Sequence, residues 1–155
     1  MSQLLQLFVI YLSSFVGTLG FSVILHAPKK SWLSAASLGG LSYAMYWLLM
    51  QLGVGDPLAN FAAALTVSLL AQFCARRMQM IATIFVALSI IPLVPGLGLY
   101  RCMSLLGQGK NAAGLQAGVA AMIAIMMIAL GLAMGAFIFR ALVALAPHHR
   151  RKEDA

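Results

Sequence analysis

The sequence predicts an all-α protein, a polytopic membrane helix bundle of about five transmembrane helices with the fourth broken between Pro92 and Gly98. Hydrophobic residues make up 63% of the chain and charged residues only 8%, whereas soluble domains contain roughly 25% charged residues. Apolar segments near the ~20 residues that a membrane-spanning helix needs recur between short polar stretches. Too few polar groups remain to cover a soluble surface, so we expect an integral membrane protein.

Three apolar segments precede the broken one, and a polar or turn-forming sequence closes each of them. They cover residues 4–25, 32–52 and 58–75. The first is closed by HAPKK, where Pro28 stops the helix. The second is closed by the turn sequence GVGDP, which carries Asp56, and the third by Arg76–Arg77.

The fourth segment starts near Met78 and is interrupted at Pro92. A short continuation over residues 97–106 leads into the polar loop GQGKNAAG. The fifth helix, predicted over 115–145, is longer than a straight crossing needs, so it must tilt or project beyond the bilayer. We divide the chain into a transmembrane helical domain, residues 1–146, and a charged cytoplasmic tail, residues 147–155.

The positive charges indicate how the helices are oriented. Five crossings place one set of basic residues on a common side: Lys29, Lys30, Arg76, Arg77, Arg150, Arg151 and Lys152. Lys and Arg accumulate on the cytoplasmic side, which predicts an outer N-terminus and a cytoplasmic C-terminus. Arg101 and Lys110 then fall outside; they are cytoplasmic only if the broken segment re-enters without crossing.

The chain carries little that could serve catalysis. It has three acidic residues, two cysteines and three histidines in all. Asp56 lies in a predicted turn, and His148–His149 lie in the tail, where solvation is a simpler role than metal binding. Cys74 and Cys102 are in apolar surroundings and have no metal-ligand spacing. We therefore expect no catalytic site, no metal and no cofactor. The net charge is +7, but the positive residues do not form the basic face that nucleic-acid binding requires, so we do not expect a nucleic-acid partner.

The predicted helices contain no Asp or Glu. Proton-coupled transporters usually keep a carboxylate or a histidine inside the membrane, so this chain is not expected to carry a proton without a partner. Neutral polar residues do occur within these helices. Two interpretations stay open: they form hydrogen bonds between helices, or they line a substrate path. They are Ser13, Ser14, Thr18, Ser34, Ser37, Ser42, Asn60, Thr66, Ser68 and Gln72.

Two small-residue pairs lie on the fifth helix. Gly114 and Gly118 form one GxxxG pair, and Gly131 and Gly135 form the other. Such pairs let helices approach closely, and at ~100° per residue these two point about a quarter-turn apart. We expect them to be helix-packing residues against two neighbours, although glycine is also common in membrane helices.

The broken segment is the strongest candidate for function. Pro92 and Pro95 lack an N–H, and Gly96 and Gly98 relax the backbone. Irregular backbone at membrane depth is tolerated where it is buried or lines an aqueous cavity, as at many transporter sites. A half-helix starting near Gly96 would present a partial positive charge that suits an anion, with Arg101 nearby. These five residues form the predicted substrate path; a plain proline kink near the outer surface is the alternative.

Pro92-Leu93-Val94-Pro95-Gly96 resembles a motif of the threonine/serine exporter family. The stretch GFSVILHAPKKSWLSAASLGGLSY, an apolar helix, a Pro-basic loop and a Gly- and Ser-rich helix, supports the likeness. The resemblance runs from about Gly20 to Gly135 and is to the small-subunit, C-terminal-type domain. Within the motif, it assigns function to Pro92, Pro95 and Gly96.

The resemblance implies a role and a partner. In split members of the family, a small chain of this type acts with a larger membrane subunit in a two-component complex. Their substrates are threonine and serine, or dicarboxylates such as succinate. We therefore predict the small subunit of an exporter of small carboxylated metabolites in the bacterial inner membrane; self-association into a homo-oligomer stays open. The alternative is a non-transporting membrane scaffold that stabilises a partner transporter.

Overall fold

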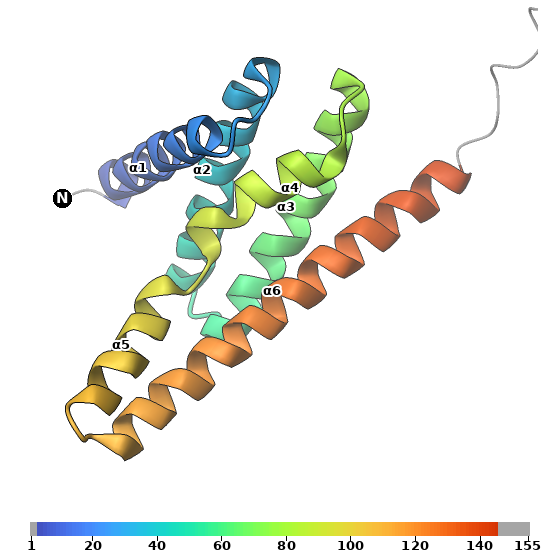
Figure 1. Cartoon of the computed structure of the whole chain (residues 1–155). Coiled ribbons are helices and arrows are strands. Elements are labelled where there is room, and N and C mark those ends of the chain that lie inside the picture. The colour runs from blue at the N-terminus through green and yellow to red at the C-terminus, as the bar shows by residue number, and fades with distance from the viewer. Residues whose placement is uncertain (1–2, 146–155) are drawn as a thin grey trace, which may run out of the picture.

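The computed structural model describes residues 3–145, and every regular element in that range is helical (Figure 1). The helices are α1 (Gln3–Ile24), α2 (Lys29–Gln51), α3 (Asp56–Met78), α4 (Ala82–Ile90), the 3₁₀ turn η1 (Ile91–Leu93), α5 (Gly96–Gly107) and α6 (Asn111–Leu145). The predicted all-α architecture is confirmed, and so is a fourth segment broken near Pro92. The predicted tail, residues 147–155, lies outside the described residues.

The number of membrane spans is close to the prediction. Three helices, α1, α3 and α6, are long and apolar enough to cross a membrane, judged by length and composition. The pair α4–η1 and α5 qualifies as a fourth with a bend of 51°. Helix α2 has 23 residues but is less apolar, because Ser, Gly and Tyr interrupt its leucines. The predicted count of about five is therefore approximate.

Helix α6 is the longest element and packs along two neighbours. Its 35 residues span about 52 Å, against about 30 Å for a bilayer core. Its first half packs on α5, and its second half packs on α3 in a parallel direction (Figure 1). The α5–α6 hairpin extends past the loop between α2 and α3, which is how the chain accommodates the extra length.

The core is built mainly from small side chains, which let helix backbones approach closely. One cluster joins α2, α3 and α4: Ala35, Leu38, Ala71, Ala75, Phe85 and Leu88. Serine hydroxyls add bonds between helices. Ser42 Oγ lies 2.9 Å from Ser89 O, and Ser68 Oγ donates to Leu132 O at 3.0 Å. The interhelical role proposed for the polar residues is confirmed for these two serines.

The boundary between the third and fourth helices differs from the prediction. Helix α3 continues to Met78, and Gln79 ends it in a left-handed conformation with φ of 53°. Arg76 and Arg77 lie in the last turn, where positive charge is favourable at a helix C-terminus. The two arginines therefore belong to the helix that they were expected to follow, and α4 begins only at Ala82.

Candidate functional site

The break in the fourth segment is shorter than predicted. Helix α4 ends at Ile90, η1 covers Ile91–Leu93, and α5 already begins at Gly96. Gly96 and Gly98 therefore lie inside α5. Gly98 packs closely on α6, since a Cβ there would lie 3.3 Å from the Cβ of Ala121.

Local hydrogen bonds close the break. Pro92 lies in the first turn of η1 and Pro95 immediately precedes α5, two positions where a missing N–H costs little. The Gly96 N–H donates to Val94 O at 2.7 Å across Pro95, whose φ of −75° and ψ of 58° match an inverse γ-turn. The backbone is thus rigidly redirected at this point, without reversing the chain, since the bend is 51°.

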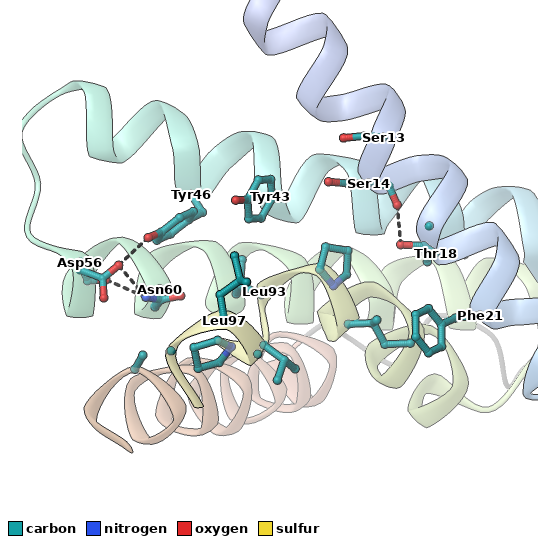
Figure 2. Close-up of a pocket in the computed structure, with 18 of the residues that line it drawn as sticks. Ser13, Ser14, Thr18, Phe21, Tyr43, Tyr46, Asp56, Asn60, Leu93 and Leu97 are labelled. Carbon is teal, nitrogen blue, oxygen red and sulfur yellow. Dashed lines mark hydrogen bonds between the residues drawn. The ribbon is translucent and has the colours of Figure 1, made fainter. Parts of the chain in front are cut away.

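A cavity of about 720 Å³ lies against the break. This volume is within the range of small-molecule sites, about 300–1,000 Å³. All eight residues from Ile91 to Gly98 border it on one side. Polar side chains from α1, α2 and α3 face them from the other side (Figure 2), namely Ser13, Ser14, Thr18, Tyr43, Tyr46, Asp56 and Asn60.

The α1 part of the cavity wall is held by close packing on α2. Thr18 is 1% exposed, and its hydroxyl donates to Ser14 O at 2.8 Å. Gly39 of α2 lies directly against Thr18, so a Cβ at this glycine would overlap the threonine side chain. At Gly40, a Cβ would lie 2.8 Å from the Tyr11 ring. Two adjacent glycines therefore bring the hydroxyls of α1 to the cavity.

The position of Asp56 differs from the prediction. Asp56 is the first residue of α3 rather than a turn residue, and it lines the cavity. The Tyr46 hydroxyl donates to its Oδ1, and Asn60 Nδ2 donates to its backbone O at 2.9 Å and to Oδ1 at 3.3 Å (Figure 2). The centroids of the Tyr43 and Tyr46 rings lie 5.7 Å apart. The spacing of Asp56 and Asn60, one helical turn apart, was the available sequence signal for this cluster.

All five residues of the predicted substrate path border the same cavity: Pro92, Pro95, Gly96, Gly98 and Arg101. Arg101 reaches it from α5, the element that follows the break. The residues that border the cavity therefore include one acidic residue, Asp56 on α3, and one basic residue, Arg101 on α5.

The four GxxxG glycines lie at two helix contacts outside the cavity. If Gly114 carried a Cβ, that atom would lie 2.8 Å from Leu106 Cγ of α5. A Cβ at Gly118 would lie 2.8 Å from Cys102 Sγ, also on α5. In the second pair, a Cβ at Gly131 would lie 2.5 Å from the backbone O of Phe61 on α3. A Cβ at Gly135 would lie 2.6 Å from Ser68 Cβ, also on α3.

Other predicted features lie away from the cavity. Ser37 and Thr66 donate to carbonyls of their own helices, at 2.9 Å and 2.8 Å. Within residues 3–145, no three His, Cys, Asp or Glu side chains gather to hold a metal ion. His148–His149 lie outside the described residues.

The family model described as "Threonine/Serine exporter, ThrE" matches residues 10–138. No curated protein and no solved structure matches the chain. The matched range contains every residue that lines the cavity, from Ser13 to Ala124.

Proposed function

This chain belongs to the threonine/serine exporter family, and from that premise we propose that it is the small membrane subunit of a two-component exporter of small carboxylated metabolites. The proposed substrates are threonine and serine, or dicarboxylates such as succinate. The observation that carries the proposal is the cavity at the broken helix, where polar side chains of three helices face an irregular backbone. Non-helical backbone at membrane depth is stable where it lines such a space.

The cavity offers groups that suit a carboxylate. Helix α5 begins there, and its first N–H groups carry the partial positive charge of a helix N-terminus. Arg101 borders the same cavity, and an arginine guanidinium can form charge-assisted hydrogen bonds with carboxylate oxygens. Both features come from one helix that starts at the break, so a substrate carboxylate would bind next to Pro95.

The resemblance and the charges support the proposed partner and location. The small-subunit type to which the chain is similar works beside a larger membrane chain, and we assign such a partner here. Lys29–Lys30 and Arg76–Arg77 lie at one end of α2 and α3, and Asp56 lies at the other. On the positive-inside rule, we place the basic end and the C-terminus in the cytoplasm, with the protein in the bacterial inner membrane.

Thiol labelling tests whether the cavity is a water-filled path, as a transport subunit requires, or a dry interior, as a scaffold would have. In a Cys74→Ala/Cys102→Ala background, Ser13→Cys and Asn60→Cys should react with a water-soluble maleimide, and saturating serine should slow both reactions. Leu33→Cys is the matched control, because Leu33 is 71% exposed on α2 away from the cavity. Cavity cysteines that react no faster than this lipid-facing control would favour the scaffold.

Efflux measurements address the substrate. Cells with and without the chain are loaded with labelled serine, threonine or succinate, and efflux is followed in the native host. Chain-dependent efflux of at least one of these compounds is expected. If none depends on the chain, the exporter proposal is wrong.

A further inference from the structure

We propose that Asp56 binds the α-ammonium group of the exported amino acid, so that the cavity selects a zwitterion over a dicarboxylate. The inference rests on the proposed function, because it names the substrate class for the same cavity. It assigns a specificity role to a residue that neither the sequence motif nor the family match singles out.

The hydrogen bonds of Asp56 leave one side of its carboxylate open. The Tyr46 hydroxyl and Asn60 Nδ2 both donate to Oδ1. Among residues 3–145, no hydrogen bond to Oδ2 is present. An oriented carboxylate with a free oxygen at a cavity is suited to a cationic donor, and an ammonium group supplies three N–H donors with its charge.

The neighbours of Asp56 are arranged to hold it in place. Asn60 lies one turn further along α3 and also binds the Asp56 carbonyl at 2.9 Å, so the amide bridges main chain and side chain. Tyr46 reaches the carboxylate from α2 and stands beside Tyr43 (Figure 2). Two helices therefore fix the carboxylate before any ligand arrives, which lowers the cost of binding.

The charges in the cavity match an amino acid. Asp56 and Arg101 line it from different helices and carry opposite signs. A zwitterion brings an ammonium group that Asp56 can bind, together with a carboxylate whose charge is favoured by a nearby cation such as Arg101. A dicarboxylate instead brings a second negative charge into a cavity that already holds a carboxylate, and such like-charge pairing disfavours the wrong ligand.

Equilibrium binding to membranes that contain the full chain, prepared from its native host, provides the test. The ligands are labelled L-serine, glycerate and succinate; glycerate has a hydroxyl where serine has its ammonium group. The wild-type protein should bind serine about ten-fold or more tightly than glycerate, the size expected for one charged hydrogen-bonding contact. Asp56→Asn should abolish this preference and leave succinate binding unchanged or tighter. Asp56→Glu, which keeps the charge, should retain part of the preference.

Tyr46→Phe gives a second test that leaves α3 intact, should Asp56→Asn fail to accumulate. It removes one donor that orients the carboxylate, so the serine preference should fall by a few-fold while succinate binding stays the same.

Each contrary outcome has a distinct meaning. If wild-type membranes bind neither serine nor succinate, the proposed function fails and the inference fails with it. If they bind serine but Asp56→Asn and Tyr46→Phe keep the full preference over glycerate, only the inference is overturned. If Asp56→Asn binds serine normally but loses gradient-driven efflux, Asp56 serves proton coupling, and the ammonium assignment is wrong.

Discussion

Asp56 illustrates how the role of a single residue depends on what the fold brings next to it. In the sequence it follows a Gly-rich turn and stands alone as an acid in the first 150 residues. In the structure it begins α3, accepts hydrogen bonds from Tyr46 and Asn60, and borders the cavity. Arg101 carries the opposite charge and borders the same cavity, and the role that we propose for it depends on that position.

We predict that substitution of Arg101 reduces the transport of anionic substrates most. Arg101→Gln keeps much of the side-chain shape and removes the cation, so transport of succinate should fall about ten-fold while that of serine falls less, because α5 still offers its N-terminus. Competitive efflux assays of the two substrates measure this. Arg77→Gln, an arginine outside the cavity lining, serves as the control. Equal efflux by Arg101→Gln and wild type for both compounds would contradict the prediction.

At the scale of elements, two features organise the molecule: the break between α4 and α5, and the glycine contacts of α6. The break redirects the chain by 51° and exposes a helix start to the cavity. The glycines let α6 approach α5 along one half and α3 along the other. Both features use residues that would weaken a helix in water, and the α6 glycines also lie where a larger side chain would clash with a neighbouring helix.

Restoring a continuous helix should harm transport rather than folding. Pro92→Ala/Pro95→Ala removes two helix breakers, each worth about 3 kcal/mol in a helix interior. The variant should insert at normal abundance and melt at the same or a higher temperature, with efflux reduced about ten-fold. Pro28→Ala, at the start of α2 and away from the cavity, is the control and should export normally. Full efflux by the double variant at wild-type abundance would make the break a purely structural kink.

The α6 glycines should differ in their tolerance of a methyl group. Gly131→Ala places its Cβ 2.5 Å from the backbone O of Phe61, which cannot rotate away. Gly118→Ala instead meets the Cys102 side chain at 2.8 Å, and Gly20→Ala meets no atom within 4 Å. We expect a loss of about 1–3 kcal/mol for Gly131→Ala, less for Gly118→Ala and none for Gly20→Ala. Thermal unfolding in detergent should reproduce this order; equal stability of all three variants would show that the glycine contacts are not needed.

At the scale of the whole molecule, the directions of the helices decide which charged ends lie together. Helices α3 and α6 are parallel, because the chain reverses its direction twice between them, once after α3 and once after α5. The basic residues Lys29–Lys30 and Arg76–Arg77 share one end, and the cavity lies toward the other end, where Asp56 begins α3. In the orientation that we propose, with the basic end in the cytoplasm, an exported substrate would meet the cavity beyond that end.

Reporter fusions test this orientation. A fluorescent protein fused after Ala155 should be bright, and alkaline phosphatase fused at the same position should be inactive, because the positive-inside rule places that end in the cytoplasm. Fusions in the α2–α3 loop, after Gly53, should show the reverse pattern. Active phosphatase beside a dark fluorescent protein at the C-terminus would exclude the five-pass orientation.

The membrane class, the helical fold and the broken fourth segment could all be predicted from the sequence. These properties depend on local features: apolar runs of the right length, the shortage of charge, and the paired prolines and glycines of residues 92–98. The family motif lies in that same stretch, so it too was visible without a structure. Only the tertiary structure decided that Ser42 and Ser68 join helices while Ser13, Thr18 and Asn60 line a cavity. Only the fold, likewise, placed Asp56 beside Tyr46. Those roles depend on contacts between different helices, and no local pattern specifies which helix faces which.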